Sequence, residues 1–164
     1  MYKRQIVLPG THYAYIENLS QVIAIINNFI FRCGRNGLIN LFWGSLLSML
    51  CLFPHEILHA VCFKEDVYLY TNFKQGMLFV VGTETMSKSR FIIMSLLPNL
   101  IFGFIPYIIA MIIPSASILG AFGAVSICMG AGDYYNAIHA LVQMPKGSRT
   151  YLHKFNSFWY IPER

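Results

Sequence analysis

The chain has 164 residues, of which 56% are hydrophobic and only 12% are charged. Soluble globular domains carry about 25% charged residues, so a soluble fold of this composition would expose large apolar patches that promote aggregation. So apolar a composition also excludes a disordered chain. The net charge is +5. We expect the basic residues to contact anionic lipid and set the orientation in a membrane, without a nucleic-acid partner.

The N-terminal segment, residues 1–18, precedes a short apolar stretch at residues 19–35. Polar residues interrupt this stretch, which predicts either a weak membrane span or a helix lying in the interface. We favour a span, because it would place ten of the twelve Lys and Arg residues on one side of the membrane. Without it the same side would hold eight. A larger bias fits the positive-inside rule better.

Three stronger candidate spans follow at residues 38–63, 91–113 and 116–144. Each is long enough for a bilayer core of about 30 Å, which needs about 20 helical residues. The middle stretch contains no charged residue. Its two prolines, Pro98 and Pro106, predict kinks that are tolerated where neighbouring helices cover the freed carbonyls.

Residues 64–90 form a loop with hydrophilic ends, and residues 67–73 and 77–81 predict a β-hairpin within it. Residues 145–164 form a basic, aromatic tail suited to the membrane–water interface. Loop and tail together carry eight Lys and Arg residues, which predicts that both are cytoplasmic. The expected fold is a single all-α polytopic membrane domain. It has three core transmembrane helices, a fourth N-terminal one, and a small cytoplasmic β-hairpin between the second and third.

One motif carries chemistry, the H-E-x-x-H sequence of residues 55–59. Residues i and i+4 share a helix face, so the imidazoles of His55 and His59 can reach one metal ion. Glu56 can then take a proton from a metal-bound water. Ionisable groups cost about 2.5–3.5 kcal/mol at the bilayer centre, so packing does not explain their presence. The alternative is a polar helix end that dips into the interface.

A catalytic zinc ion usually has three protein ligands and one open position. Asp133 is the best third ligand, because His55 and Asp133 each lie 17 residues after the start of their own spans. At 1.5 Å per residue both would sit about 26 Å along their helices. Two alternatives stay open. Asp133 could be a lone carboxylate at the helix end, solvated or paired with Lys146. The third ligand could instead be His139 or Glu84.

These motifs resemble the site-2-protease-like intramembrane zinc metallopeptidases, most closely their small bacterial relatives described as zincin peptidases of a domain of unknown function. The resemblance covers roughly residues 38–149 and rests on residues 55–59, Leu97-Pro98-Asn99, and Gly130-Ala131-Gly132-Asp133 with Met144-Pro145-Lys146-Gly147. It implies Zn²⁺ held by His55, His59 and Asp133, with Glu56 as the catalytic base. The larger site-2 proteases have a glycine after the aspartate, whereas this chain has Tyr134.

Three further residues are candidates for contacts with a metal ligand or with substrate. Asn99 could orient substrate or stabilise an oxyanion, or it could cap a carbonyl freed near Pro98. Tyr134 could donate to a tetrahedral intermediate or anchor the helix at the interface. His139 could hydrogen-bond a metal ligand or donate a proton. Each also has a purely structural reading.

The sequence therefore predicts an intramembrane zinc metallopeptidase that hydrolyses peptide bonds of membrane proteins near the cytoplasmic face. Its expected partners are the lipid bilayer and a transmembrane protein or peptide substrate. The alternative is a non-catalytic metal-binding membrane protein, such as a pseudoprotease or an immunity or stress factor. The oligomeric state stays open, and so does the metal, because a His₂-carboxylate set also suits iron.

Overall fold

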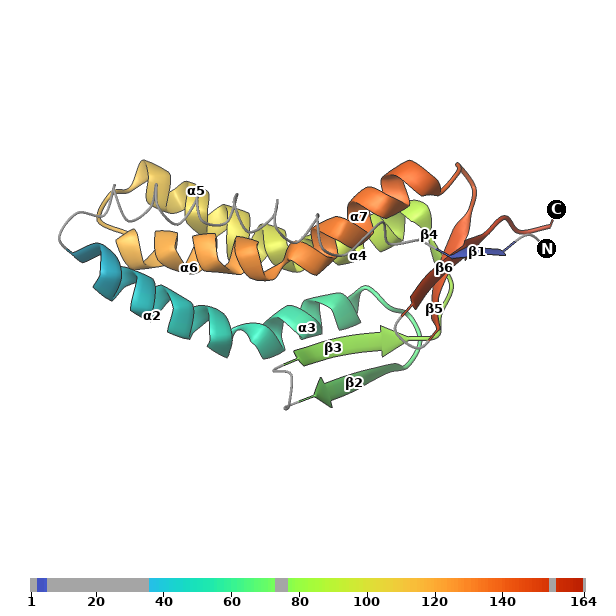
Figure 1. Ribbon diagram of the computed structural model, residues 1–164, viewed down its shortest axis with the longest axis horizontal. Helices are drawn as coiled ribbons and strands as arrows, with labels where there is room; N and C mark the ends of the chain where they lie inside the picture. Colours follow the sequence, from blue (N-terminus) through green and yellow to red (C-terminus); the bar gives the residue numbers. More distant parts are fainter. Residues whose placement is uncertain (1–2, 6–35, 73–76, 154–155, 164) are drawn as a thin grey trace. The chain divides into compact units, whose positions relative to one another are not determined.

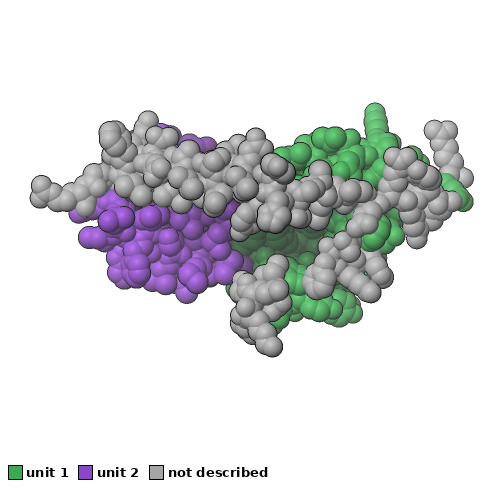
Figure 2. Space-filling view, in the orientation of Figure 1, with its two compact units in different colours: residues 1–7, 53–98, 133–164 green, residues 8–52, 99–132 purple. Residues whose placement is uncertain are grey.

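The computed structural model describes residues 3–5, 36–72, 77–153 and 156–163 (Figure 1). The chain divides into two units, each built from separate stretches of sequence (Figure 2). Unit 1 holds residues 1–7, 53–98 and 133–164, and unit 2 holds residues 8–52 and 99–132. The predicted span at residues 19–35 lies outside the described residues.

Unit 1 contains a four-stranded antiparallel sheet in the order β1-β6-β5-β4. Its strands are β1 (Lys3–Gln5), β4 (Met86–Ser87), β5 (Arg149–His153) and β6 (Asn156–Tyr160). Trp159 is opposite Arg4 on one side and Thr150 on the other, and Met86 is opposite Thr150. The sheet thus joins the two ends of the described chain to its middle.

A second, two-stranded sheet in unit 1 is the hairpin of β2 (Val67–Asn72) and β3 (Met77–Gly82). The strands pair antiparallel from Val67 opposite Gly82 to Asn72 opposite Met77. Seven of the twelve residues in the two strands are aromatic or β-branched, and such residues favour pleated structure. The predicted hairpin is confirmed, while its turn at residues 73–76 lies outside the described residues.

Three helices complete unit 1: α3 (Leu52–Val61), α4 (Lys88–Pro98) and most of α7 (Ala131–Gln143). Ser87 caps α4, because its hydroxyl accepts a hydrogen bond from the Arg90 amide at 3.4 Å. The core of the unit joins helices and sheet through buried apolar side chains: Met86, Phe91, Met94, Ala140, Met144 and Trp159.

The first turn of α4 holds the carboxyl ends of the other two helices. Lys88 donates through Nζ to the carbonyls of Leu141 at 2.9 Å and Met144 at 2.7 Å, at the end of α7. Arg90 donates to the carbonyl of Cys62, just beyond α3, at 2.8 Å from Nε and 2.6 Å from a terminal nitrogen. Cations at helix carboxyl ends satisfy orphan carbonyls and complement the helix dipole.

Unit 2 contains α2 (Gly37–Leu50), the π-helix η2 (Asn99–Phe104), α5 (Ile105–Ile112) and α6 (Ser117–Met129). Small residues let α2 and α6 approach closely, because a Cβ on Gly44 would lie 2.5 Å from the Cβ of Ala121. Ser48 hydrogen-bonds the hydroxyl of Ser126 at 3.1 Å and donates to the carbonyl of Phe122 at 3.1 Å. These polar contacts lie buried between apolar helices.

The prediction of an all-α polytopic fold is wrong, because the structure contains two antiparallel sheets. The expected interfacial tail forms β5 and β6, and Trp159 is buried in the core with 7% of its surface exposed. The aromatic residues that suggested a membrane interface also favour strands. β6 pairs with β1 from the opposite end of the sequence, and no local pattern reveals such a contact.

The number of membrane spans also differs from the prediction. Among the described residues, one continuous helical stretch, Lys88–Ile112, is long and apolar enough to cross a membrane alone. Two helix pairs, α2 with α3 and α6 with α7, pass the same test only if each bent pair counts as one span. The first break has a local cause, since Pro54 has no amide hydrogen to donate to the carbonyl of Leu50.

The close approach at Gly44 makes a stability prediction. Gly44→Ala should lower the free energy of unfolding by about 1–3 kcal/mol, because its methyl group would overlap the backbone of α6. Gly132→Ala is the matched control, since its Cβ would meet no atom within 4 Å. Thermal unfolding in detergent, followed by circular dichroism, measures both. Equal stability of the two variants would contradict the packing of α2 on α6.

The Arg90–Glu84 ion pair predicts a pH dependence of stability. The Arg90 guanidinium that hydrogen-bonds Glu84 lowers the pKa of this carboxyl, and the backbone amide of Lys64, 2.7 Å away, lowers it further. A lowered folded-state pKa stabilises the fold above the unfolded value, about 4.3, and this contribution is lost as the pH falls below it. When the unfolding midpoint is measured as a function of pH, it should therefore fall less steeply at acidic pH in Glu84→Gln than in wild type. Glu65→Gln, at an exposed glutamate, should leave this pH dependence unchanged.

Candidate metal centre

The H-E-x-x-H motif lies on α3, and its helical spacing sets the two histidines on one face. The rings of His55 and His59 lie edge to face, with centroids 4.9 Å apart. Their side chains are largely buried, with 18% and 12% of their surface exposed. The motif therefore forms a pair of imidazoles directed to the same place.

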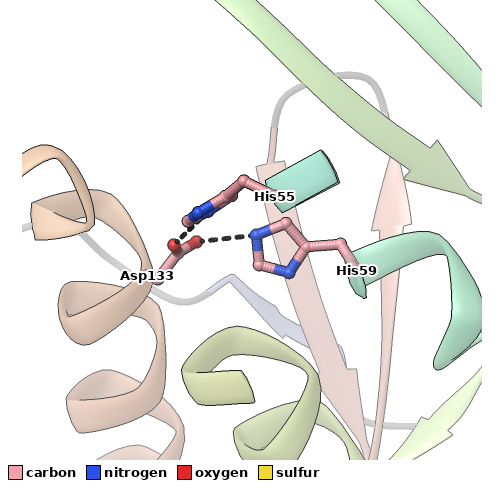
Figure 3. A group of neighbouring side chains, drawn as sticks. All are labelled: His55, His59 and Asp133. Carbon is pink, nitrogen blue, oxygen red and sulfur yellow. Dashed lines mark hydrogen bonds and ion pairs between the residues drawn. The ribbon is translucent and has the colours of Figure 1, made fainter. Parts of the chain in front are cut away.

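Asp133 comes from the first turn of α7, and its carboxylate faces both rings, with one oxygen directed to each (Figure 3). One carboxylate oxygen, Oδ2, is 3.2 Å from Nε2 of His55, and the other, Oδ1, is 3.4 Å from Nε2 of His59. One ligand atom from each of the three residues lies within 4.8 Å of the others. All three residues belong to unit 1, so the cluster forms within one unit.

A hydrogen bond at Nδ1 of His59, the ring nitrogen that does not face Asp133, bears on whether a metal ion fits the cluster. Nδ1 of His59 lies 2.9 Å from the backbone carbonyl oxygen of Met94. A carbonyl only accepts, so this hydrogen bond needs the hydrogen on Nδ1, and in a neutral ring with that tautomer Nε2 presents a lone pair to Asp133. Two acceptors facing each other repel unless a proton or a cation lies between them. The cluster is thus arranged for a positive charge at its centre.

The donor set fits zinc. Catalytic zinc sites take three protein ligands from histidine and carboxylate side chains and leave a fourth position open. Ligating histidines commonly donate their other ring nitrogen to a carbonyl or carboxylate, which is the arrangement of His59 and Met94. His55, His59 and Asp133 would hold the ion. Their assignment as ligands stays a prediction.

Glu56 follows His55 in α3 and is buried, with 8% of its surface exposed. Its Oε2 accepts a hydrogen bond of 2.9 Å from the backbone amide of Val80 in β3. Glu56 is not part of the three-residue ligand group. This buried carboxylate lies next to a predicted ligand and can accept a proton without itself coordinating the metal ion. Its role as catalytic base stays a prediction.

The two alternative ligands named from sequence have other contacts. His139 is hydrogen-bonded through Nδ1 to the Gln143 side chain at 2.6 Å, and its ring lies 4.1 Å from that of Tyr135. Glu84 is paired with Arg90 at the start of α4. Neither belongs to the cluster that the described residues form around Asp133.

The remaining candidates lie in different places. Asn99 belongs to unit 2 and is 1% exposed. It packs so tightly on Gly130 that a Cβ there would lie 1.6 Å from its Oδ1. Tyr134 follows Asp133 in α7 and is half-buried. Substrate roles for Asn99 and Tyr134, and a proton-transfer role for His139, stay predictions.

Sequence reasoning missed two backbone groups of the site, the carbonyl of Met94 and the amide of Val80. Backbone groups are the same in every residue, so neither has a side-chain signature. For Val80 the sequence carries no signal. For Met94 it carries one, a proline four residues later in the same helix.

Comparison with known proteins places this site within one protein family. No curated protein and no solved structure matches the chain. A family profile described as "Putative zincin peptidase" matches residues 48–149, which is more than half of the chain and includes every residue of the cluster. The chain therefore belongs to this zincin peptidase family, DUF3267.

Proposed function

We propose that this protein is a zinc-dependent endopeptidase that acts on membrane proteins near the cytoplasmic face. The observation that carries the proposal is the convergence of His55, His59 and Asp133, with Glu56 beside them on the same helix. Membership of the zincin peptidase family supports the same reaction class. The substrate would be a peptide segment in an extended conformation, because a helical backbone hides its carbonyls.

The residues of the site divide the chemistry between them. When bound, zinc lowers the pKa of a coordinated water to about 7 and polarises the scissile carbonyl. Glu56 accepts the proton from the attacking water and passes it to the leaving amine nitrogen. The amide of Val80 holds Oε2 of Glu56, so Oε1 is the oxygen available to carry that proton.

Exposed apolar side chains support a membrane location. On α2 and α5, more than half of the surface is exposed for Leu38, Phe42, Leu50, Ile108 and Ile112. Water would penalise such surfaces, whereas lipid would not. The helical stretch Lys88–Ile112 has 25 residues, about 37 Å at 1.5 Å per residue, which exceeds the bilayer core of about 30 Å.

The charge distribution supports the proposed orientation. Loop 64–90 and tail 145–164 carry eight of the twelve Lys and Arg residues. Basic residues flanking membrane segments remain in the cytoplasm. The site lies on α3, which immediately precedes this loop, so substrate would be cleaved near the cytoplasmic side.

One observation favours a second candidate function, a non-catalytic metal-binding membrane protein. The Val80 amide already hydrogen-bonds Glu56, so the carboxylate also connects α3 to the hairpin. In that case the metal would stabilise the fold, and Glu56 would be needed only as a hydrogen-bond acceptor.

Removal of single ligands tests the metal centre. Protein purified without chelators should contain about one zinc per chain, and His55→Ala or Asp133→Ala should lose it, because two remaining ligands bind zinc weakly. Elemental analysis by mass spectrometry measures the content. His139→Ala, a histidine outside the cluster, is the control and should keep its zinc. Metal-free wild type would refute the centre, and unaltered zinc in Asp133→Ala would remove Asp133 as third ligand.

Removal of one charge tests catalysis. Glu56→Gln keeps an acceptor for the Val80 amide but cannot take a proton, so cleavage should fall by about 10²–10⁴-fold while zinc content stays unchanged. The readout is hydrolysis of fluorescein-labelled casein by the protein in detergent. Glu65→Gln, at an exposed loop glutamate, should cleave as wild type does. Full activity in Glu56→Gln would exclude Glu56 as the base. If wild type binds zinc but cleaves nothing, the non-catalytic function is favoured.

A further inference from the structure

The hydrogen bond between His59 and Met94 depends on an exception in helix α4. In an α-helix the carbonyl of residue i accepts the amide hydrogen of residue i+4. Four residues after Met94 the chain has Pro98, which is still within α4 and has no amide hydrogen. The Met94 carbonyl instead lies 2.9 Å from Nδ1 of His59.

The Met94 carbonyl lies in buried surroundings. Pro98 is fully buried and Met94 is 8% exposed, so bulk water does not replace the missing helical donor. A proline ring in a helix also clashes with the carbonyl four residues earlier and pushes it outward. Both effects turn the Met94 carbonyl toward α3, where His59 lies in the same unit.

Two acceptors compete for the single hydrogen of a neutral His59 ring. The carboxylate of Asp133, 3.4 Å from Nε2, favours the hydrogen on Nε2. The Met94 carbonyl favours it on Nδ1. A hydrogen on Nε2 would block the nitrogen that faces the cluster, so the tautomer decides whether His59 is ready to bind metal.

We propose that Pro98 is a positioning residue for the metal centre: by freeing the Met94 carbonyl, it holds His59 as the Nδ1–H tautomer with Nε2 open to a metal ion. The inference rests on the proposed zinc function, which it deepens by naming what orients one ligand. Groups that hydrogen-bond a ligating histidine typically change metal affinity by 10–100-fold when they are lost.

Pro98→Ala tests the proposal, because alanine restores an amide hydrogen that draws the Met94 carbonyl back into the helix. Zinc affinity, measured by competition with a chromogenic chelator, should weaken by about 10–100-fold. The matched control is Pro106→Ala, the same change at a buried proline in α5 of unit 2, and it should bind zinc as wild type does. Unchanged affinity in folded Pro98→Ala, or equal weakening in both variants, would overturn the proposal.

A second measurement needs no proline variant. The chain has five histidines, so long-range ¹H–¹⁵N spectra of the metal-free protein can resolve each imidazole. The His59 signals are identified by their loss in His59→Gln, and the pH is raised until they stop shifting. Wild type should show the hydrogen on Nδ1, and Pro98→Ala should move it to Nε2. A hydrogen on Nε2 in wild type would overturn the proposal.

These readouts separate the inference from the function on which it rests. If wild type binds no zinc, the proposed function fails, while the tautomer of His59 in metal-free protein still tests the role of Pro98. If zinc binding and cleavage are present but the tautomer does not respond to Pro98→Ala, the function stands and the inference fails.

Discussion

The site depends on one contact, the placement of the Asp133 carboxylate between Nε2 of His55 and Nε2 of His59. These groups come from α3 and α7, which are more than 70 residues apart in the sequence. A carboxylate at 3.2 and 3.4 Å from two imidazole nitrogens needs a hydrogen on each nitrogen or a metal ion between them. Both helices must therefore be held firmly, since a shift of about 1 Å spoils a metal or catalytic geometry.

Helix α4 supplies that support to both of them. Its first turn holds the end of α7 through Lys88 and the end of α3 through Arg90, and its carbonyl at Met94 holds the ring of His59. Each interaction uses a backbone group that a regular helix leaves without a partner, at a carboxyl end or before a proline. Among the helices described in unit 1, α4 has no predicted metal ligand, and it is the one that contacts both helices that carry them. Within unit 1, the contacts of α4 that complete the ends of α3 and α7 thus also hold the helices that carry the predicted ligands.

The histidine pair was accessible from the sequence because its signal, the i and i+4 spacing of His55 and His59, is local. Asp133 was chosen by counting residues along two straight predicted spans, but the structure breaks both stretches into bent helix pairs. Its approach to the histidines therefore depends on the fold of unit 1. The fold was less accessible. The pairing of β1 with β6 joins opposite ends of the chain, and the aromatic residues of β6 suited a membrane interface as well as a strand. The Val80 amide has no signal in the sequence, so only the folded backbone reveals it. The Met94 carbonyl is marked only indirectly, by Pro98 four residues later in the same helix.

The contact between Val80 and Glu56 bears on whether the site is catalytic. A hydrogen bond from an amide needs only an acceptor, and the neutral carbonyl of a glutamine can also accept it. Burial disfavours an ionisable carboxylate more than a neutral amide, so a purely structural role would favour the amide. Glu56 nevertheless carries a carboxylic acid, and one of its oxygens accepts the Val80 amide hydrogen. Proton transfer needs that ionisable group, whereas connecting α3 to the hairpin does not.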